Sequence, residues 1–442
     1  MLKLMKPAVL LVIAVLAFAA PARAEGIETF TTPAGIEVWL KSEPTIPILA
    51  LDFAFRGGAS LDPADRPGIA NMVSGLLDEG AGDLDSKAFQ DRLDELSVQL
   101  SFDAGRDEFH GGLTTLIENQ DEAFELLRLA LNEPRFDPEP VERIRGQILI
   151  SLRSAAEDPN AVAWDAFTAA AFPDHPYGRP VDGTEESVAE ITDAELHGFV
   201  TDAFARDRLI VAAVGAIDAA TLAPLVDKAF AGLPATGATL DVPDVTAQAG
   251  KVEVIDMDVP QSAIAFGLPG ISRDDPDFYA AFVLNKALGG GGLNTRLFEE
   301  VRKKRGLVYS VGTYLYPYEH AGLWLGSAGT QNARAGETLD VIRDVLADVV
   351  ENGISQTELD DAKAYLTGSF PLQLSSNAGI ASMLVTMQVD RLGADYLEQR
   401  NSYIDAVTPE DVQRVAARLL DPDNMLVVVT GRPEGVTPSV AN

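Results

Sequence analysis

The sequence predicts an α+β fold of two homologous domains of about 200 residues, each a mainly antiparallel sheet with helices packed on one face. Three observations lead to this prediction. The chain has 442 residues, which is too long for one ordinary hydrophobic core. Segments of the first half recur in the second half at a near-constant spacing. Strand and helix patterns are mixed within each half and do not follow a strict β-α-β alternation.

Three kinds of segment recur in the same order, 216 to 218 residues apart. They are a helix opening (191–196 and 407–412), an apolar strand that ends in glycine (208–215 and 424–431), and the lead-in to a long amphipathic helix (136–142 and 354–360). This regularity indicates an internal duplication. We therefore expect domains at 25–235 and 250–442, joined by a linker at 236–249 in a stretch rich in Pro, Ala, Thr and Asp.

Residues 1–24 have the pattern of a secretory signal peptide. Lys3 and Lys6 form a basic start, and the apolar run 8–20 is too short to span a bilayer comfortably. Ala22-Arg23-Ala24 then offers a cleavage site. We expect cleavage after Ala24, and a mature protein that is exported, soluble and periplasmic.

The composition excludes several classes of function. With 34 Lys+Arg against 67 Asp+Glu the net charge is −33, so binding to nucleic acid or to an anionic membrane is not expected. The chain has no cysteine, which excludes disulfides and thiol catalysis. With so many acidic residues, a neighbouring pair of carboxylates is weak evidence for acid or glycoside hydrolysis. No Gly-x-Ser-x-Gly motif is present, and no lysine follows the glycines at 289–292 as a phosphate loop requires.

In the first half, the run 48–55 predicts a strand with Leu49, Leu51, Phe53 and Phe55 on one face. Pro67 is placed to begin a helix that runs through Leu77. The remaining expected elements are strands at 98–102 and 109–116 and helices at 122–131 and 141–156.

The most specific stretch of the chain is 288–309, LGGGGLNTRLFEEVRKKRGLVY. Asn294 is a plausible N-cap for a helix from Thr295 to Lys304, which Gly306 would end. Leu293, Leu297 and Val301 are expected to face the core on one stripe. A strand at 308–316 follows, with Tyr309, Val311 and Thr313 predicted to share a face.

This stretch resembles the second-half signature of the insulinase/pitrilysin family of zinc metallopeptidases, in its short, processing-peptidase-like form. The internal repeat and His175-Pro-Tyr-Gly agree with the resemblance. It implies that Arg302 and Tyr309 bind substrate by donating hydrogen bonds near the scissile carbonyl of a peptide. A guanidinium and a phenol suit that task. The alternative is structural: a surface ion pair for Arg302 and a core-edge position for Tyr309.

The family's first-half signature is a helical His-x-x-Glu-His, in which two histidines bind zinc and the glutamate acts as general base. Aligned by the preceding strand and Arg-Gly-Gly turn, the resemblance places these three positions at Asn71, Ser74 and Gly75. A third ligand, a glutamate in a later long helix, falls at Ser151. These residues form a degenerate zinc site. The four histidines lie far apart in sequence, and we expect His175 to be structural and His197 to be on a solvated helix face.

Some members of this family work in pairs. One subunit binds zinc, and the other lacks zinc and supplies Arg and Tyr. The resemblance therefore implies a zinc-free, non-catalytic subunit of a periplasmic heterodimer that degrades peptides. Its partner would be a homologous zinc-bearing subunit, and this chain itself would bind no cofactor. The alternatives are a catalytically inert peptide-binding or scaffold protein of the same fold, and an enzyme active alone through an unrecognised zinc site.

Overall fold

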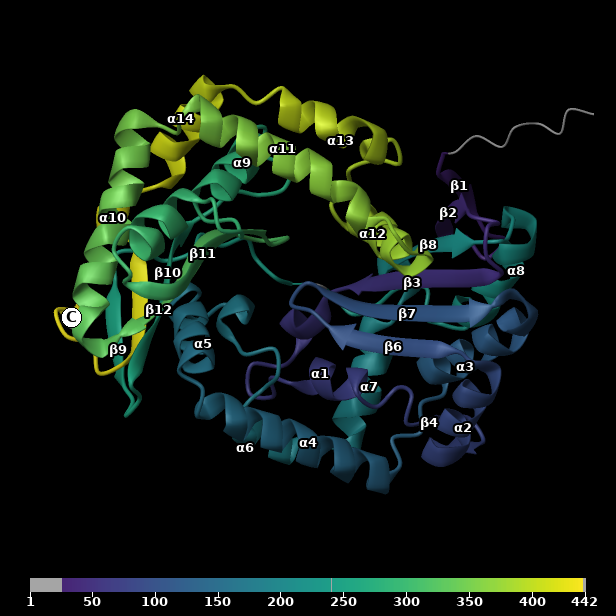
Figure 1. The fold of residues 1–442 in the computed structure, drawn as a ribbon. Coiled ribbons are helices and arrows are strands. Elements are labelled where there is room, and N and C mark those ends of the chain that lie inside the picture. The colour runs from purple at the N-terminus through teal and green to yellow at the C-terminus, as the bar shows by residue number, and fades with distance from the viewer. Residues whose placement is uncertain (1–25, 240, 440–442) are drawn as a thin grey trace, which may run out of the picture.

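The computed structural model describes residues 26–239 and 241–439, so the expected signal peptide lies outside the described residues. Two separate sheets form the two halves of the molecule (Figure 1). The first has the order β1-β2-β8-β3-β7-β6, in which β2 and β8 are parallel and the other pairs are antiparallel. Its strands are β1 Glu28–Thr31, β2 Glu37–Ser42, β3 Ile48–Arg56, β6 Gln99–Ala104, β7 Glu108–Leu116 and β8 Leu209–Gly215.

The second sheet repeats this topology. Its order is β9-β13-β10-β12-β11, with β9 and β13 parallel, so each of its strands has a counterpart among the last five strands of the first sheet. The strands are β9 Val252–Asp256, β10 Gln261–Pro269, β11 Val308–Pro317, β12 Gly322–Gln331 and β13 Leu426–Gly431. The predicted fold class and the internal duplication are therefore confirmed.

The helices of each half cover one face of that half's own sheet, as predicted, except for α5 and α12. Leu49, Leu51, Phe53 and Phe55 of β3 are buried in the core of the first half. The helices of that half are α1 Ile69–Ser74, α2 Ser86–Leu96, α3 Gln120–Asn132, α4 Pro138–Ala156, α6 Glu185–Glu190, α7 Asp193–Ala203 and α8 Ala219–Phe230. Those of the second half are α9 Phe278–Leu288, α10 Ala335–Asn352, α11 Gln356–Gln373, α13 Tyr396–Asp405 and α14 Pro409–Leu419. Short pieces are β4 Gly80–Ala81, β5 Leu84–Asp85, η1 Gly58–Leu61, η2 Ile117–Asn119, η3 Pro176–Gly178, η4 Arg206–Arg208, η6 Asn332–Arg334 and η7 Pro422–Asn424.

Each half also gives one helix to the other half's sheet. Helix α5 (Pro159–Ala171) comes from the first half but packs on β10 and β13 of the second sheet. Helix α12 (Asn377–Val389) comes from the second half but packs on β3 and β8 of the first (Figure 1). The exchange depends on close approach: a Cβ on Gly267 of β10 would lie 2.7 Å from the ring of Phe167. The two halves are therefore joined by two reciprocal apolar contacts.

The connection between the halves packs closely onto both of them. Residues 232–239 and 241–250 contain no helix or strand. The amide of Val245 donates to the carbonyl of His320, and that of Gln248 donates to Ala171 at the end of α5. Among the described residues, no helix is long and apolar enough to cross a membrane.

The first-half helix expected from Pro67 through Leu77 is shorter than predicted, because α1 covers only Ile69–Ser74. Gly68, at φ 98°, starts the helix, and the buried carboxylate of Asp62 accepts from the amides of Gly68 and Ala70 at 2.7 and 3.0 Å. That carboxylate caps the helix, so Pro67 lies before it and not in its first turn.

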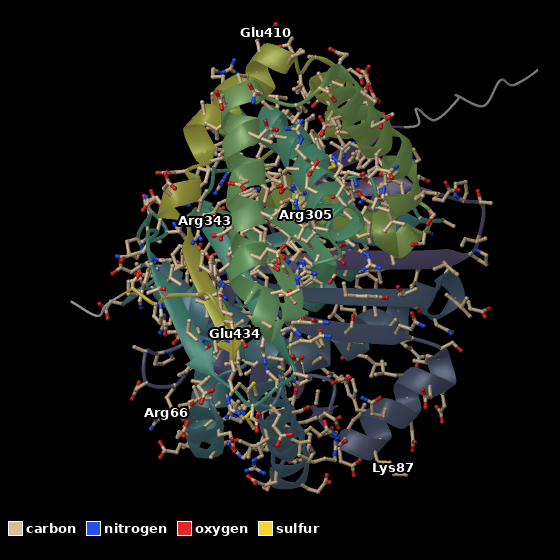
Figure 2. All side chains as sticks on the ribbon, turned by 60° about the vertical axis from the view of Figure 1, so that its left-hand side comes forward. Arg66, Lys87, Arg305, Arg343, Glu410 and Glu434 are labelled. Atoms are coloured by element: carbon tan, nitrogen blue, oxygen red, sulfur yellow. The ribbon has the colours of Figure 1, made fainter. Side chains whose placement is uncertain are left out.

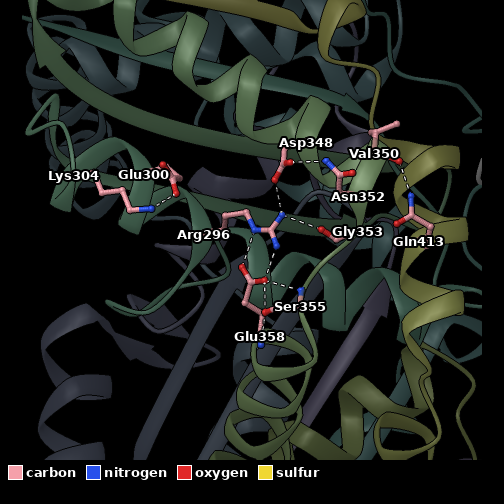
Figure 3. A network of polar contacts seen from close by, with 10 residues as sticks. All are labelled: Arg296, Glu300, Lys304, Asp348, Val350, Asn352, Gly353, Ser355, Glu358 and Gln413. Atoms are coloured by element: carbon pink, nitrogen blue, oxygen red, sulfur yellow. Dashed lines mark hydrogen bonds and ion pairs between the residues drawn. The ribbon is translucent and has the colours of Figure 1, made fainter.

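The glycine-rich stretch continues into a π-helix, Phe298–Lys303, where an α-helix was expected. A buried arginine fixes this segment to the helices beside it (Figure 3). Arg296 donates to both carboxylate oxygens of Glu358 at 2.7 and 2.5 Å, to Asp348 at 3.1 Å and to the carbonyl of Gly353 at 2.9 Å. Its side chain is only 15% exposed, and the two carboxylates belong to α10 and α11.

Burial opposes ionisation of Glu358, but hydrogen bonds from Arg296 and Ser355 outweigh it and lower the pKa of Glu358 to about 2. Most other ion pairs lie on the surface, where charged side chains such as Lys87 and Arg343 point outward (Figure 2). Exposed pairs of that kind contribute about 0–1 kcal/mol each. The Arg296–Glu358 pair is therefore the ion pair on which the position of the π-helix depends.

The helix exchange predicts that a core mutation in α5 destabilises the protein through the second half's sheet. Phe167→Ala removes a fully buried ring and should lower the free energy of unfolding by about 3–5 kcal/mol. Urea unfolding followed by circular dichroism measures this change. Ile150→Ala, at a position 67% exposed on α4, is the control and should change stability by less than about 0.5 kcal/mol. Equal effects of the two substitutions would contradict the packing described.

Glu358→Gln should lower stability by about 1–3 kcal/mol at pH 7, because it removes the charge that pairs with Arg296. The pKa is depressed in the folded state, so the stabilisation is complete above the unfolded value of about 4.3 and is lost as the pH falls toward 2. Urea midpoints from pH 7 to pH 3 should therefore converge for the two proteins. Asp340→Asn, in an exposed pair with Arg343, is the matched control. A difference between the two urea midpoints that stays constant from pH 7 to pH 3 would show that the charge of Glu358 does not cause the difference in stability.

Candidate functional site

Three of the four positions that the family resemblance assigns to a zinc site, Asn71, Ser74 and Gly75, lie on and just after α1. The hydroxyl of Ser74 donates to the carbonyl of Asn71 at 2.8 Å, so it is occupied within its own helix. Gly75 ends the helix, and a Cβ there would lie 3.2 Å from Cγ2 of Ile144 on α4. A side chain at position 75 would require Ile144 to shift by a few tenths of an ångström. The packing is therefore tight where the second histidine would stand.

Ser151, the fourth position of the degenerate site, is exposed on α4. Across residues 26–239 and 241–439, no group of three or more His, Cys, Asp or Glu is arranged to hold a metal ion. The donor set at these four positions does not suit zinc, because an amide, two hydroxyls and a glycine replace imidazole and carboxylate. That these positions derive from a zinc site stays a prediction based on the resemblance.

Arg302 and Tyr309 lie together at the end of the π-helix and the start of β11. The guanidinium carbon of Arg302 is 4.9 Å from the centroid of the Tyr309 ring, and Nη1 donates to the carbonyl of Val308 at 3.1 Å. Tyr309 is 80% exposed, so it does not fill a core edge. Arg302 makes no ion pair within the described residues. The structural alternative for these two residues therefore does not describe the geometry.

Two local expectations about this stretch were wrong. Leu293 is 66% exposed in the glycine-rich loop and shares no buried stripe with Leu297 and Val301, because the helical turns begin only at 296. The hydroxyl of Thr295, and not Asn294, accepts from a helix amide, that of Phe298 at 3.4 Å.

Tyr309 also does not share a face with Val311 and Thr313. The pairing of β11 with β12 shifts between Val308 and Val311, so that two residues, Tyr309 and Ser310, lie opposite one. This β-bulge turns the Tyr309 side chain out to solvent while Val311 and Thr313 stay buried. A strict two-residue alternation cannot reveal a bulge, which explains the error.

The glycine-rich loop is held by a buried lysine. Lys286 on α9 donates to the carbonyls of Gly290 and Gly291 at 3.1 and 2.7 Å, and its amine lies 3.3 Å from the ring centroid of Tyr365. Burial lowers the pKa of Lys286. The amide of Thr313 donates to the carbonyl of Gly289 and fixes the loop against β11. The loop therefore supports the segment that carries Arg302 and does not expose its lysine to a ligand.

Sequence reasoning missed a polar junction between the two halves. The Tyr177 hydroxyl donates to Asp107 at 2.5 Å and accepts from the amide of His320 in the β11–β12 turn at 3.0 Å. His175 is buried and structural, as expected: Nδ1 accepts from the amide of Tyr177, so Nε2 donates to the carbonyl of Pro243. His197 is exposed on α7, also as expected. His175-Pro-Tyr-Gly was the only sequence signal for this junction.

Beside the junction lies a cavity of about 460 Å³ between the halves. Its walls carry an excess of acidic residues over the two arginines present: Asp107, Glu108, Asp274, Glu319 and Asp390 against Arg273 and Arg391. Burial, with repulsion from Asp107, raises the pKa of Glu108 to about 7. Burial likewise raises the pKa of Asp52 to about 7 on the same face of the first sheet. Part of the protein's acidity therefore lies between the halves, a location that composition alone could not show.

Comparison with known proteins agrees with this architecture. A family model described as insulinase (peptidase family M16) matches residues 37–185, and one described as the peptidase M16 inactive domain matches residues 190–366. The division between these models falls before β8, whereas the two sheets divide after it, so the domain boundaries given above remain predictions.

Some relatives are named as zinc proteases, and one is named as a non-peptidase homolog. A protein of Streptomyces coelicolor named as an uncharacterized zinc protease is 33% identical over 298 residues, covering 64% of this chain and 63%, just under two thirds, of its own length. YmxG of Helicobacter pylori, named as a non-peptidase homolog, is 27% identical over 353 residues, covering 80% of this chain and 81% of its own.

A solved structure from Pseudomonas fluorescens, described as a peptidase M16 inactive domain, superposes with a TM-score of 0.87 at 29% identity. The superposition covers 93% of this chain and 99% of that one. The chain therefore belongs to the insulinase (M16) peptidase family, in the form that lacks the zinc-binding residues.

Proposed function

We propose that this chain is the zinc-free subunit of an exported two-subunit peptidase, and that it contributes Arg302 and Tyr309 to an active site whose metal belongs to a homologous partner. The observation that carries the proposal is that these two side chains lie together and, within the described residues, donate only one hydrogen bond to the rest of the fold. Tyr309 is 80% exposed, and Arg302 uses one of its five N–H donors on a carbonyl of its own chain.

The chemistry that this pair can perform is carbonyl recognition. A guanidinium and a phenol are both donors, and two donors aimed at a peptide carbonyl oxygen stabilise the negative charge that develops there during hydrolysis. Arg302 is held by the π-helix, which Arg296 fixes to α10 and α11. The guanidinium of Arg302 is thus preorganised, which is the condition under which such stabilisation is large.

The first half supports the absence of a metal from this subunit. The position of the second histidine is a glycine that packs closely against Ile144, and the other positions offer no imidazole or carboxylate. The name of the Helicobacter pylori relative, a non-peptidase homolog, agrees with a subunit that does not cleave peptides alone. Export to the periplasm rests on the signal pattern of residues 1–24.

Arg302→Ala should lower the turnover of the paired enzyme by about 10²-fold, because removing one oxyanion donor has an effect of that order. Tyr309→Phe, which removes only the hydroxyl, should lower turnover by about tenfold. Both effects are measured with a quenched fluorescent peptide and the mature chain mixed with a homologous partner that carries His-x-x-Glu-His. An adjacent gene for such a chain would identify the partner to use.

Arg305→Ala is the matched control, since Arg305 is three residues further on and pairs with Glu300 on the outer surface. It should leave turnover within about twofold. Size-exclusion chromatography of each mixture shows whether the pair still assembles. Unchanged cleavage by both site variants in an assembled pair would remove Arg302 and Tyr309 from the mechanism. A stable pair in which no cleavage depends on this chain would support the inert scaffold.

The purified mature chain should contain no stoichiometric zinc, and it should cleave no peptide when zinc is added. Inductively coupled plasma mass spectrometry measures the metal content, and the same fluorescent peptide measures cleavage. The physical reason is the donor set at Asn71, Ser74, Gly75 and Ser151. Chelator-sensitive cleavage by this chain alone would show that it has a metal site of its own.

A further inference from the structure

The exchanged helix α5 leaves part of the second sheet open. It packs on β10 and β13, whereas the same face of β11 carries Tyr314 and Tyr316, which are 48% and 43% exposed. Between them and the bulge at Tyr309 this face has only small residues, Gly312 on β11 and Ser327 opposite it on β12. We call this surface, formed by Gly312, Tyr314, Tyr316 and Ser327, the tyrosine shelf.

The rings of the tyrosine shelf belong to a row that runs along β11. The centroids of Tyr314 and Tyr316 are 6.3 Å apart, and those of Tyr316 and Tyr318 are 5.8 Å apart. An extended peptide repeats its side chains on one side every ~6.6 Å, twice the strand rise per residue. The row therefore matches the spacing of alternate side chains in an extended peptide.

The end of the row at Tyr318 already holds a guanidinium of this chain, and so does Tyr309 at the bulge before the row. Arg302 lies 4.9 Å from the ring centroid of Tyr309, and Arg106 lies 5.8 Å from that of Tyr318. Within the described residues, no Lys or Arg lies over Tyr314 or Tyr316. The rings of Tyr314 and Tyr316 thus present the same kind of surface as those of Tyr309 and Tyr318, with no cation on them.

The charge nearby favours a cationic ligand. The row ends at Pro317 and Tyr318, which line the 460 Å³ cavity with its excess of carboxylates. The edge of β11, in contrast, is poorly suited to adding a strand. The amide and carbonyl of Thr313 are taken by Gly289 and Asn285, and Pro317 has no N–H to offer. A peptide on this surface would therefore be held by its side chains.

We propose that the tyrosine shelf binds an extended peptide with basic side chains at alternate positions, each placed over one of the two tyrosine rings. This proposal rests on the proposed function, because it assumes that the bound peptide is the substrate whose carbonyl contacts Arg302 and Tyr309. Tyr314 follows Tyr309 by five residues, or ~16 Å of strand. The shelf thus selects residues about five positions from the reacting bond.

The binding test uses the purified mature chain alone, without zinc or a partner. The probes are two fluorescein-labelled 12-residue Gly/Ser/Ala peptides of the same composition, one with arginines at positions i and i+2 and the other at i and i+1. Fluorescence anisotropy should show the alternate-spaced peptide binding about two- to fivefold more tightly, the contribution of one exposed cation–π contact. Replacing its arginines with citrulline should abolish this difference. Equal binding of the two arginine peptides would overturn the proposal.

The ring variants identify where the peptide binds. Tyr314→Leu and Tyr316→Leu should each weaken the alternate-spaced peptide about two- to fivefold, whereas Tyr314→Phe should keep the affinity because the ring face remains. Ser327→Leu should also weaken binding, since it fills the space beside the rings. Tyr403→Leu, an exposed tyrosine on α13, is the control and should have no effect. Loss of affinity in the control alone, or in none of the variants, would place the peptide elsewhere.

The two proposals can fail separately. In the paired enzyme, Tyr314→Leu and Tyr316→Leu should raise KM for the alternate-spaced peptide and leave kcat unchanged, because they do not touch the reacting carbonyl. If the peptide binds the shelf but Arg302→Ala does not affect turnover, the proposed function is wrong and the shelf stands. If Arg302→Ala lowers turnover but neither Tyr314→Leu nor Tyr316→Leu changes KM, only the proposal of peptide binding at the tyrosine shelf is wrong.

Discussion

The reciprocal exchange of α5 and α12 is the constraint on which the remaining architecture depends. Each of these helices is required in a core that the other half of the chain builds, so neither sheet is complete on its own. Phe167 fills the space left by the missing side chain of Gly267, and Ile380 and Leu384 pack on the small residues Ala50 and Ala54. Two such contacts fix the relative position of the sheets far more firmly than the linker alone could.

Because each exchanged helix covers only part of a sheet face, β7 and β6 of the first sheet and β11 of the second stay open on that face. The open strands of the first half present Ser101, Asp103 and His110, and the open strand of the second presents tyrosines. One inner surface is therefore polar and acidic while the other is aromatic. The Tyr177–Asp107 junction closes the gap between them at one end and leaves the acidic cavity beside it. The duplication thus produced two equivalent surfaces with different chemistry.

The fold could be predicted from the sequence because the same local signals occur in both halves of the chain. Thr192 and Thr408 each form a capping box at the start of a helix, and β8 and β13 each end in glycine, so a signal in one half supports the other. The site was less predictable. The bulge that turns out Tyr309 depends on pairing with β12, and Leu293 is exposed because the helix begins late. The junction joins Asp107 to Glu319 and Tyr177 to His320, residues that no local pattern connects.

The two halves differ in how far the positions that the family resemblance identifies contribute to folding stability. In the first half, Ile144 packs closely against Gly75, so this position belongs to the core contacts of the fold. In the second half, a tyrosine 80% exposed and an arginine that makes no ion pair among the described residues contribute little to folding. Yet Arg296, Lys286 and Thr313 all hold the segment that presents them. A fold that only had to be stable would not need this support for an exposed tyrosine and a half-buried arginine. The arrangement is what a binding surface requires, with rigid donors that remain free for a ligand.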